Sequence, residues 1–179
     1  MDMVRKYNCT DVANFIVEKI NEYNKQQSFQ NKISLTNRRL NLLLYFLEIE
    51  YMKRNNGTPL FENFKAWPYG PTIPSIVSKF AQLHNGQMVL WSTEKTTELT
   101  EDIKSIIYEV LEVTKNIDTQ DLISISNVVG GPWQQIYNEN DNLHEQVISK
   151  ETMYNYYLSR ELFENAEVEL NSYSKIKKR

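Results

Sequence analysis

Residues 36–54 predict a helix that is apolar on nearly every side. One face, with the three- and four-residue spacing of an α-helix, is formed by Leu40, Leu43, Leu44, Leu47 and Tyr51. Leu42, Phe46 and Ile49 widen that surface well beyond an ordinary amphipathic stripe. A helix of this kind must be buried on several sides, so we expect it to be the central helix of the fold.

The ends of this helix are marked by residues with the expected chemistry. Thr36 is a predicted N-cap, because its hydroxyl can accept a hydrogen bond from a backbone amide of the first turn. Asn56-Gly57 is predicted to end the helix, since Gly57 can adopt the left-handed conformation. Pro59 prevents the helix from resuming.

The segment FKAWPYGPTIPSIVSKF, residues 64–80, predicts a rigid bend. It contains three of the five prolines, namely Pro68, Pro71 and Pro74. Each proline fixes its own φ angle and restricts the residue before it, and Gly70 supplies a position for positive φ. We expect Phe64–Trp67 to form a short strand that pairs with a second strand at Gln87–Trp91. Pro74 is expected to begin a helix that ends at residues 84–86.

The rest of the chain predicts helices over 10–27, 100–116, 119–129, 132–138 and 149–165. The predicted N-caps are Thr10, Thr100, Thr119 and Ser149. The expected fold is therefore mainly α, with about six or seven helices and a small β-ribbon or two- to three-strand sheet. We expect a single compact domain over residues 1–165 and a polar, partly basic tail over residues 166–179.

Composition restricts the functional class. The 179 residues carry a formal net charge of −3, with both signs mixed along the chain, which argues against a basic nucleic-acid-binding face. The one cysteine, Cys9, excludes an internal disulfide and suits a reducing compartment. No apolar run has the length of a membrane span or a signal peptide, so we expect a cytoplasmic protein without membrane insertion.

No motif for catalysis, metal binding or cofactor binding emerges from the sequence. His84 and His144 are far apart, and neither has a ligand partner at helical spacing. No nucleophile elbow, Gly-rich dinucleotide loop or phosphate-binding loop is present. We therefore expect no cofactor, no metal and no enzyme activity. Aromatic residues in MYNYYLSRELF, residues 153–163, are expected either to pack in the core or to contact a partner.

Two sequence blocks resemble a known family. The first combines Leu-Leu-Tyr-Phe at residues 43–46 with Ala-Trp-x-x-Gly-Pro at residues 66–71. The second is LISISNVVGGPWQQIYN at residues 122–138, with Trp133 as its tryptophan. Together they resemble the Panacea domain, also called the SocA-like or phage-associated (GepA) family. The resemblance covers roughly residues 7–160, and Leu42 departs from it where many members carry a second basic residue.

The resemblance implies an antitoxin of a bacterial or phage toxin–antitoxin system, which neutralises a co-encoded protein toxin by direct binding. The alternatives are an adaptor that delivers the toxin to a bacterial protease, or a DNA-binding regulator of its own operon. The acidic charge balance argues against the regulator. The candidate residues, for partner binding or as signatures of the fold, are Arg39, Tyr45, Trp67, Tyr69, Gly70, Pro71 and Trp133. For the residues of the bend, a role in the fold is favoured over partner contact.

Overall fold

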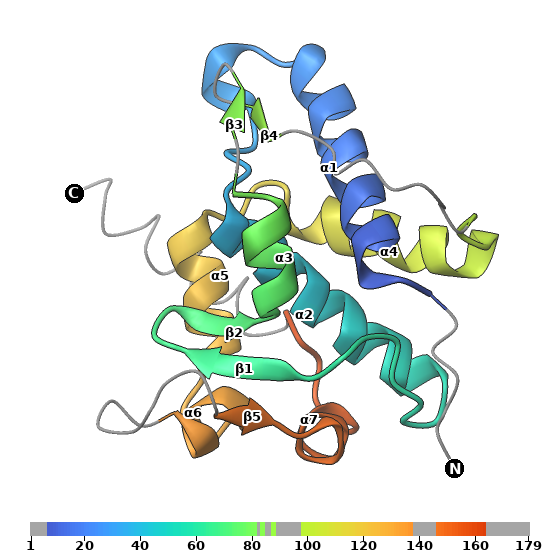
Figure 1. Cartoon of the computed structure of the whole chain (residues 1–179), viewed down its shortest axis with the longest axis vertical. Helices are drawn as coiled ribbons and strands as arrows, with labels where there is room; N and C mark the ends of the chain where they lie inside the picture. Colours follow the sequence, from blue (N-terminus) through green and yellow to red (C-terminus); the bar gives the residue numbers. More distant parts are fainter. Residues whose placement is uncertain (1–6, 82, 85–86, 89–97, 138–145, 164–179) are drawn as a thin grey trace.

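Helix α2 (Asn37–Arg54) runs through the middle of the molecule, and the other elements pack around it (Figure 1). The computed structural model describes residues 7–81, 83–84, 87–88, 98–137 and 146–163. Every residue from Arg39 to Ile49 is buried, and α2 contacts α1, α3, α4, α5, α7 and strand β2. The prediction of a central helix buried on several sides is confirmed.

The other helices, with their bounds, are α1 (Cys9–Lys25), α3 (Pro74–Lys79), α4 (Glu101–Thr114), α5 (Thr119–Ser126), α6 (Pro132–Ile136) and α7 (Lys150–Tyr157). A short 3-10 turn at Phe29–Asn31 follows α1. With α2 these make seven α-helices in the described part of the chain, so the prediction of a mainly α fold is confirmed. None of the helices within these described ranges is both long and apolar enough to span a membrane.

A three-stranded antiparallel sheet lies against one side of α2, with the order β2–β1–β5. Strand β1 (Phe64–Trp67) pairs with β2 (Gly70–Thr72) through Lys65 opposite Thr72 and Trp67 opposite Gly70. The other edge of β1 pairs with β5 (Val147–Ile148), which is distant from β1 in sequence. The sheet thus joins the proline-rich bend to the segment before α7 (Figure 1).

The predicted pairing of Phe64–Trp67 with Gln87–Trp91 is wrong. The chain turns back at once through Pro68 and Tyr69, because Gly70 adopts a φ of +124° and allows a tight local hairpin. Strand β4 (Gln87–Met88) pairs instead with β3 (Leu83–His84), and residues 89–91 lie outside the described residues. Helix α3 accordingly ends at Lys79 rather than at residues 84–86.

The helix caps agree with the predictions in part. Thr36 and Ser149 cap α2 and α7, accepting hydrogen bonds from Arg39 N at 3.1 Å and Thr152 N at 3.0 Å. At α1 and α5 the caps are the residues Asn8 and Asp118, not Thr10 and Thr119. Thr100 occupies the cap position of α4, but its hydroxyl bonds to the Tyr7 hydroxyl at 2.8 Å.

Other predicted boundaries also shift. Asn56 and Gly57 have φ angles of 50° and 81° and follow the end of α2, as expected. Helix α7 ends at Tyr157, well before the predicted residue 165. The predicted boundary between the domain and the tail lies outside the described residues, as does His144.

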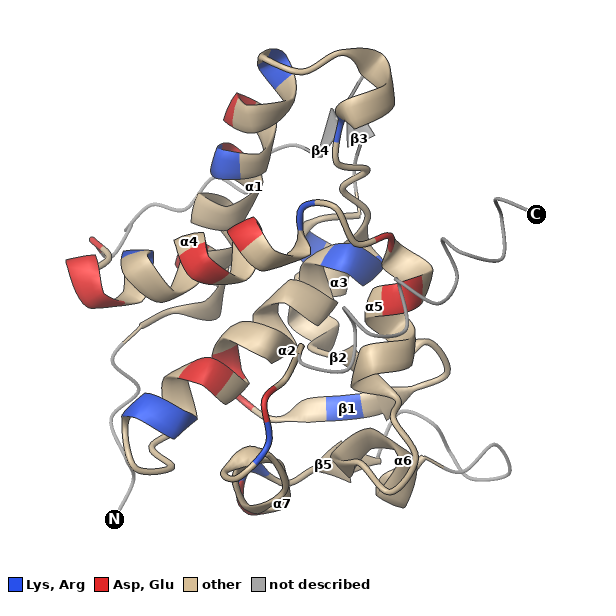
Figure 2. Ribbon diagram, turned by 180° about the vertical axis from the view of Figure 1, so that it is seen from behind, with Lys and Arg blue, Asp and Glu red and all other residues tan. Residues whose placement is uncertain are grey.

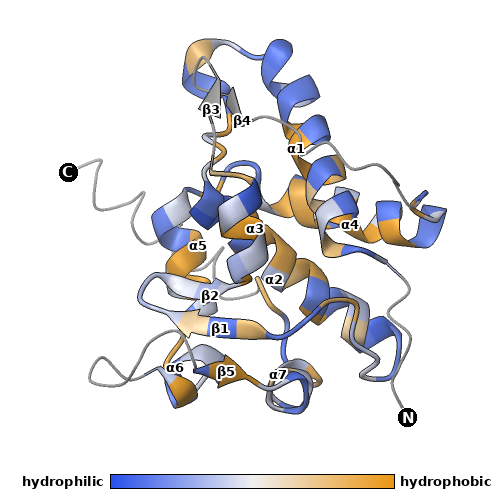
Figure 3. Ribbon diagram, in the orientation of Figure 1, coloured by the Kyte–Doolittle hydropathy of each residue, from blue (hydrophilic) through white to orange (hydrophobic). Residues whose placement is uncertain are grey.

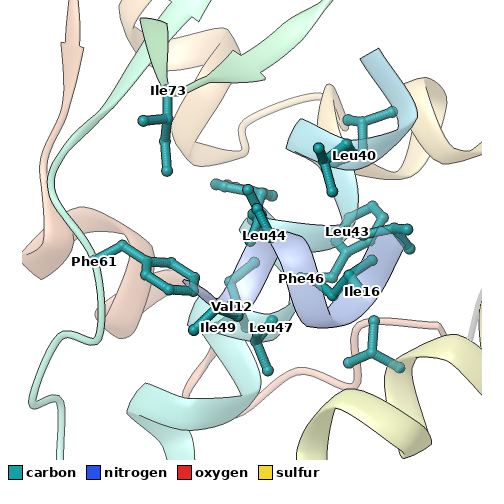
Figure 4. Packing of buried hydrophobic residues seen from close by; sticks show 14 of the residues in the cluster. Val12, Ile16, Leu40, Leu43, Leu44, Phe46, Leu47, Ile49, Phe61 and Ile73 are labelled. Carbon is teal, nitrogen blue, oxygen red and sulfur yellow. The ribbon is translucent and has the colours of Figure 1, made fainter. Parts of the chain in front are cut away.

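The core is one continuous apolar cluster centred on α2. Val12 and Ile16 of α1 meet the α2 leucines from one side, while Phe61 and Ile73 approach from the segments around the sheet (Figure 4). In Figure 3 the apolar residues gather where α2 and α4 meet, and the far end of α1 is mainly hydrophilic. Burial of this apolar surface is the main favourable contribution to folding.

Replacing Gly70 by alanine tests the hairpin. A Cβ at Gly70 would lie 3.3 Å from Leu42 Cδ2 and 3.2 Å from Ser126 Oγ, and φ is +124°. We expect the free energy of unfolding, measured in urea, to fall by about 3 kcal/mol. Gly130→Ala is the control, because Gly130 also has positive φ (+76°) but no heavy atom within 4 Å of such a Cβ. Its cost should be about 1 kcal/mol, and equal losses for both variants would contradict the role of close packing.

Candidate functional site

The structure brings most of the predicted residues together around the β1–β2 hairpin. Trp67 lies in β1, Gly70 and Pro71 lie in β2, and Trp133 comes from α6. The Trp133 indole donates a hydrogen bond from Nε1 to the Trp67 backbone carbonyl at 2.9 Å. The buried Trp133 ring also stacks on Tyr137, with centroids 4.4 Å apart. These contacts fasten α6 to the hairpin.

Tyr45 approaches the same region from inside the molecule. Its ring is fully buried and makes edge-on contacts with Phe46, Phe64 and Tyr157. Burial raises the pKa of Tyr45 well above its ordinary value, so the phenol stays neutral at physiological pH. In this structure Tyr45 packs the core beside β1 and offers no surface to a partner.

Tyr69 has the opposite environment. Its side chain is 61% exposed at the hairpin turn, and the Arg38 guanidinium lies over its ring, with Cζ 3.9 Å from the centroid. We call Arg38 and Tyr69 the hairpin surface. Stacked arginine and tyrosine side chains are common anchors of protein interfaces. Of the predicted residues, Tyr69 is the one most open to solvent.

Arg39 lies apart from the hairpin, near the start of α2. It is only 4% exposed, and its Nη1 and Nη2 donate to the backbone carbonyls of Ile117 at 2.9 Å and Thr114 at 2.8 Å. Among the described residues no carboxylate lies within 4.0 Å of the guanidinium, and burial lowers the pKa of Arg39. Arg39 therefore fastens the α4–α5 connection to α2 while keeping a buried positive charge.

Asn41, two residues after Arg39, performs a similar role. Its Oδ1 accepts a hydrogen bond from Ile73 N at 2.7 Å, and its Nδ2 donates to the Asn37 carbonyl at 2.9 Å. The bond to Ile73 holds the junction between β2 and α3 against the central helix. A buried amide with both ends satisfied costs little, whereas an unsatisfied one would be strongly destabilising.

Glu48 is the third buried polar residue of α2, and it is fully buried. Its carboxylate accepts hydrogen bonds from Phe61 N at 3.0 Å and Lys150 Nζ at 2.5 Å, with Leu60 N as a further donor. Burial raises the pKa of Glu48 above its ordinary value of 4.5, and the Lys150 ammonium opposes that shift. Glu48 thus connects the segment after α2 to the start of α7.

Sequence reasoning singled out Arg39 but missed Asn41 and Glu48 as anchoring residues. Both are buried polar residues in the most apolar helix of the chain, seven positions apart and so on one face. The sequence did offer a signal for them, namely a polar residue between core positions of a helix. Burying such a group is costly unless it forms hydrogen bonds, so partners are expected. The identity of those partners depends on tertiary structure.

The described residues contain no group of three or more His, Cys, Asp or Glu side chains placed to hold a metal ion. Burial raises the pKa of the Cys9 thiol well above its ordinary value, with nearby Glu62 and Glu48 adding to the shift. The thiolate is the reactive form of cysteine, so the raised pKa keeps the half-buried Cys9 in its unreactive thiol form.

Lys150→Met tests the buried ion pair. The variant leaves the Glu48 carboxylate buried without its ammonium, so we expect the free energy of unfolding to fall by about 3 kcal/mol at pH 8. The loss should be smaller at pH 5. Without Lys150 the folded-state pKa of Glu48 rises further above its unfolded value, and stability then decreases as pH rises through that folded pKa.

Lys104→Met is the matched control, since Lys104 pairs with Glu101 on the surface, where an ion pair contributes little. Urea unfolding at both pH values measures the effect. A loss that is the same for both variants, or independent of pH, would contradict the assignment.

A family model matches this chain over a span that includes the β1–β2 hairpin and the residues that pack against it. The model describes the antitoxin SocA-like Panacea domain and matches residues 40–134, more than half of the 179 residues. Neither a curated protein nor a solved structure matches the chain. The matched span contains most of α2, the β1–β2 hairpin and Trp133, which the structure shows packed together. The chain belongs to the SocA-like, Panacea-domain family of antitoxins.

Proposed function

We propose that this protein is the antitoxin of a bacterial or phage toxin–antitoxin system and neutralises a co-encoded protein toxin by direct binding in the cytoplasm. The observation that carries the proposal is the match of residues 40–134 to the SocA-like antitoxin domain. The function needs no catalytic step and no cofactor. It needs a stable fold that presents a surface to another polypeptide.

The arrangement of polar groups supports a binding function. Arg39, Asn41 and Glu48 are occupied by backbone groups or by Lys150, so these buried polar residues serve the fold. Exposed aromatic and apolar side chains remain for contact, including Tyr69 and Tyr108, which are 61% and 49% exposed. Tyrosine is enriched at interfaces because it buries a large area with little loss of rotamer entropy.

Co-expression with the product of the neighbouring gene tests the proposal. We expect that product alone to arrest growth of the host and this chain to restore growth when both are produced. The two proteins should also purify as a complex, and the level of the toxin should be unchanged while growth recovers. A toxin that disappears only in cells with an intact protease would support an adaptor instead. Persisting arrest, or a harmless neighbour, would contradict the proposal.

A further inference from the structure

A groove lies between the second half of α1 and the second half of α4. Its cavity volume is about 800 Å³. The apolar residues that line it are Ile20, Tyr23, Ile33, Tyr108, Leu111 and Val113. Tyr108 and Val113 are 49% and 48% exposed, so much of this apolar surface is open to water. Exposed apolar surface gathered in one concave place is typical of an interaction site.

The groove continues into a polar cavity of about 540 Å³. The two cavities share Tyr23, Ile33 and Lys115, so they form one depression, which we call the α1–α4 groove. The polar end is lined by three cations, Lys32, Arg39 and Lys115, and by one carboxylate, Asp118. This end of the groove therefore has an excess of positive charge.

The cations at the polar end differ in their partners. Lys115 pairs with Glu112 of α4, and Asp118 accepts a hydrogen bond from Asp121 N at 2.8 Å as the cap of α5. Arg39 is bonded to carbonyls, and its buried Nε has no hydrogen-bond acceptor. Neither Arg39 nor Lys32 has a carboxylate within 4.0 Å in the described part of the chain. Asp118 acts on Arg39 through space without forming an ion pair, so the net positive charge at this end comes mainly from Lys32 and attracts an anionic group.

Charge is distributed unevenly along the groove. Figure 2 shows mainly acidic residues along α4 and residues of both signs along α1. On the apolar floor, Lys19 is paired with Glu22 at 2.9 Å, and Glu109 is paired with Arg54. These pairs leave the floor nearly neutral, so the unbalanced charge lies at the end lined by Lys32 and Arg39. An occupant that complements both parts is apolar along most of its length and anionic at one end.

We propose that the α1–α4 groove receives a segment of the protein partner whose apolar side chains lie on Tyr108, Leu111 and Val113 and whose carboxylate pairs with the exposed Lys32. The inference rests on the proposed function and names the surface and the chemistry that the toxin would use. A small molecule fits less well, because the half-exposed walls would leave it largely uncovered. A second copy of the chain would place the same cations opposite each other across a twofold axis.

Four substitutions on exposed side chains test this assignment in the full chain. Val113→Glu places a charge on the apolar floor, and Lys32→Glu reverses the charge at the polar end. Val129→Glu, at an 85% exposed valine on the α5–α6 connection, is the matched control, and Arg38→Glu tests the hairpin surface as the competing contact. Binding of each variant to the purified product of the neighbouring gene is measured by calorimetry, and thermal unfolding verifies that each variant is folded.

We expect Val113→Glu to weaken binding by about tenfold or more. Lys32→Glu should weaken it by about threefold or more, and this effect should shrink as salt is added. Val129→Glu should bind within about twofold of the unaltered chain, and Arg38→Glu should weaken binding less than Val113→Glu does. An Asp or Glu of the partner replaced by Lys should restore binding to Lys32→Glu but not to Val113→Glu, because only the first defect is one of charge.

The outcomes separate this inference from the proposed function. If the unaltered chain does not bind the neighbouring gene product, the proposed function fails and the inference fails with it. If the unaltered chain binds and both groove variants bind as tightly as it does, only the inference is overturned. Loss of binding in Arg38→Glu alone would place the contact at the hairpin surface, and loss in Val129→Glu alone would place it at the α5–α6 connection. Either result would overturn the inference. If the free chain self-associates and Val113→Glu abolishes that self-association, the groove is instead a contact between two copies of the chain, and the inference is overturned.

Discussion

The structure depends on one buried helix that carries polar groups in its most apolar stretch. Residues of α2 from Arg39 to Ile49 are all buried, so the side chains of Arg39, Asn41 and Glu48 cannot be hydrated. Each must find partners within the protein, because an unsatisfied buried polar group costs more than a hydrogen bond returns. The partners come from the α4–α5 connection, the β2–α3 junction, the segment after α2 and the start of α7. The buried polar groups of α2 thereby fix the positions of these four segments relative to the central helix.

This arrangement separates the residues that build the fold from those open to a partner. Trp133 is bonded to the Trp67 carbonyl, and Tyr45 is enclosed by Phe46, Phe64 and Tyr157. Most residues that carry the family resemblance are thus engaged within the molecule, with Tyr69 as the exception. Half of the α1–α4 groove, in contrast, is formed by α1 and the residues after it, which precede the matched span 40–134. The sequence of the groove can therefore change without changing the residues that hold the hairpin and α6 together.

Local chemistry made much of this fold predictable from sequence. The apolar girth of α2, the caps Thr36 and Ser149 and the positive φ of Gly57 all depend on neighbouring residues, and the structure agrees with each. The pairing of β1 with residues 147–148 was not predictable, because two residues of strand give no periodic signal. Asn41 and Glu48 were missed for a related reason, since their partners are far away in sequence. The groove depends on how α1 lies beside α4, where the rings of Phe15 and Tyr108 meet edge to face, and no local pattern reveals this.

The position of β5 has a consequence for synthesis on the ribosome. A growing chain that has emerged only to residue 134 contains the whole family-matched span. It still lacks Val147–Ile148, which cover the outer edge of β1, and Lys150, which neutralises Glu48. An uncovered strand edge favours association with other chains, and a buried carboxylate without a cation opposes folding. Translation must therefore proceed past α7 before the protein attains its stable form, and truncated products are expected to be substrates for cellular proteases.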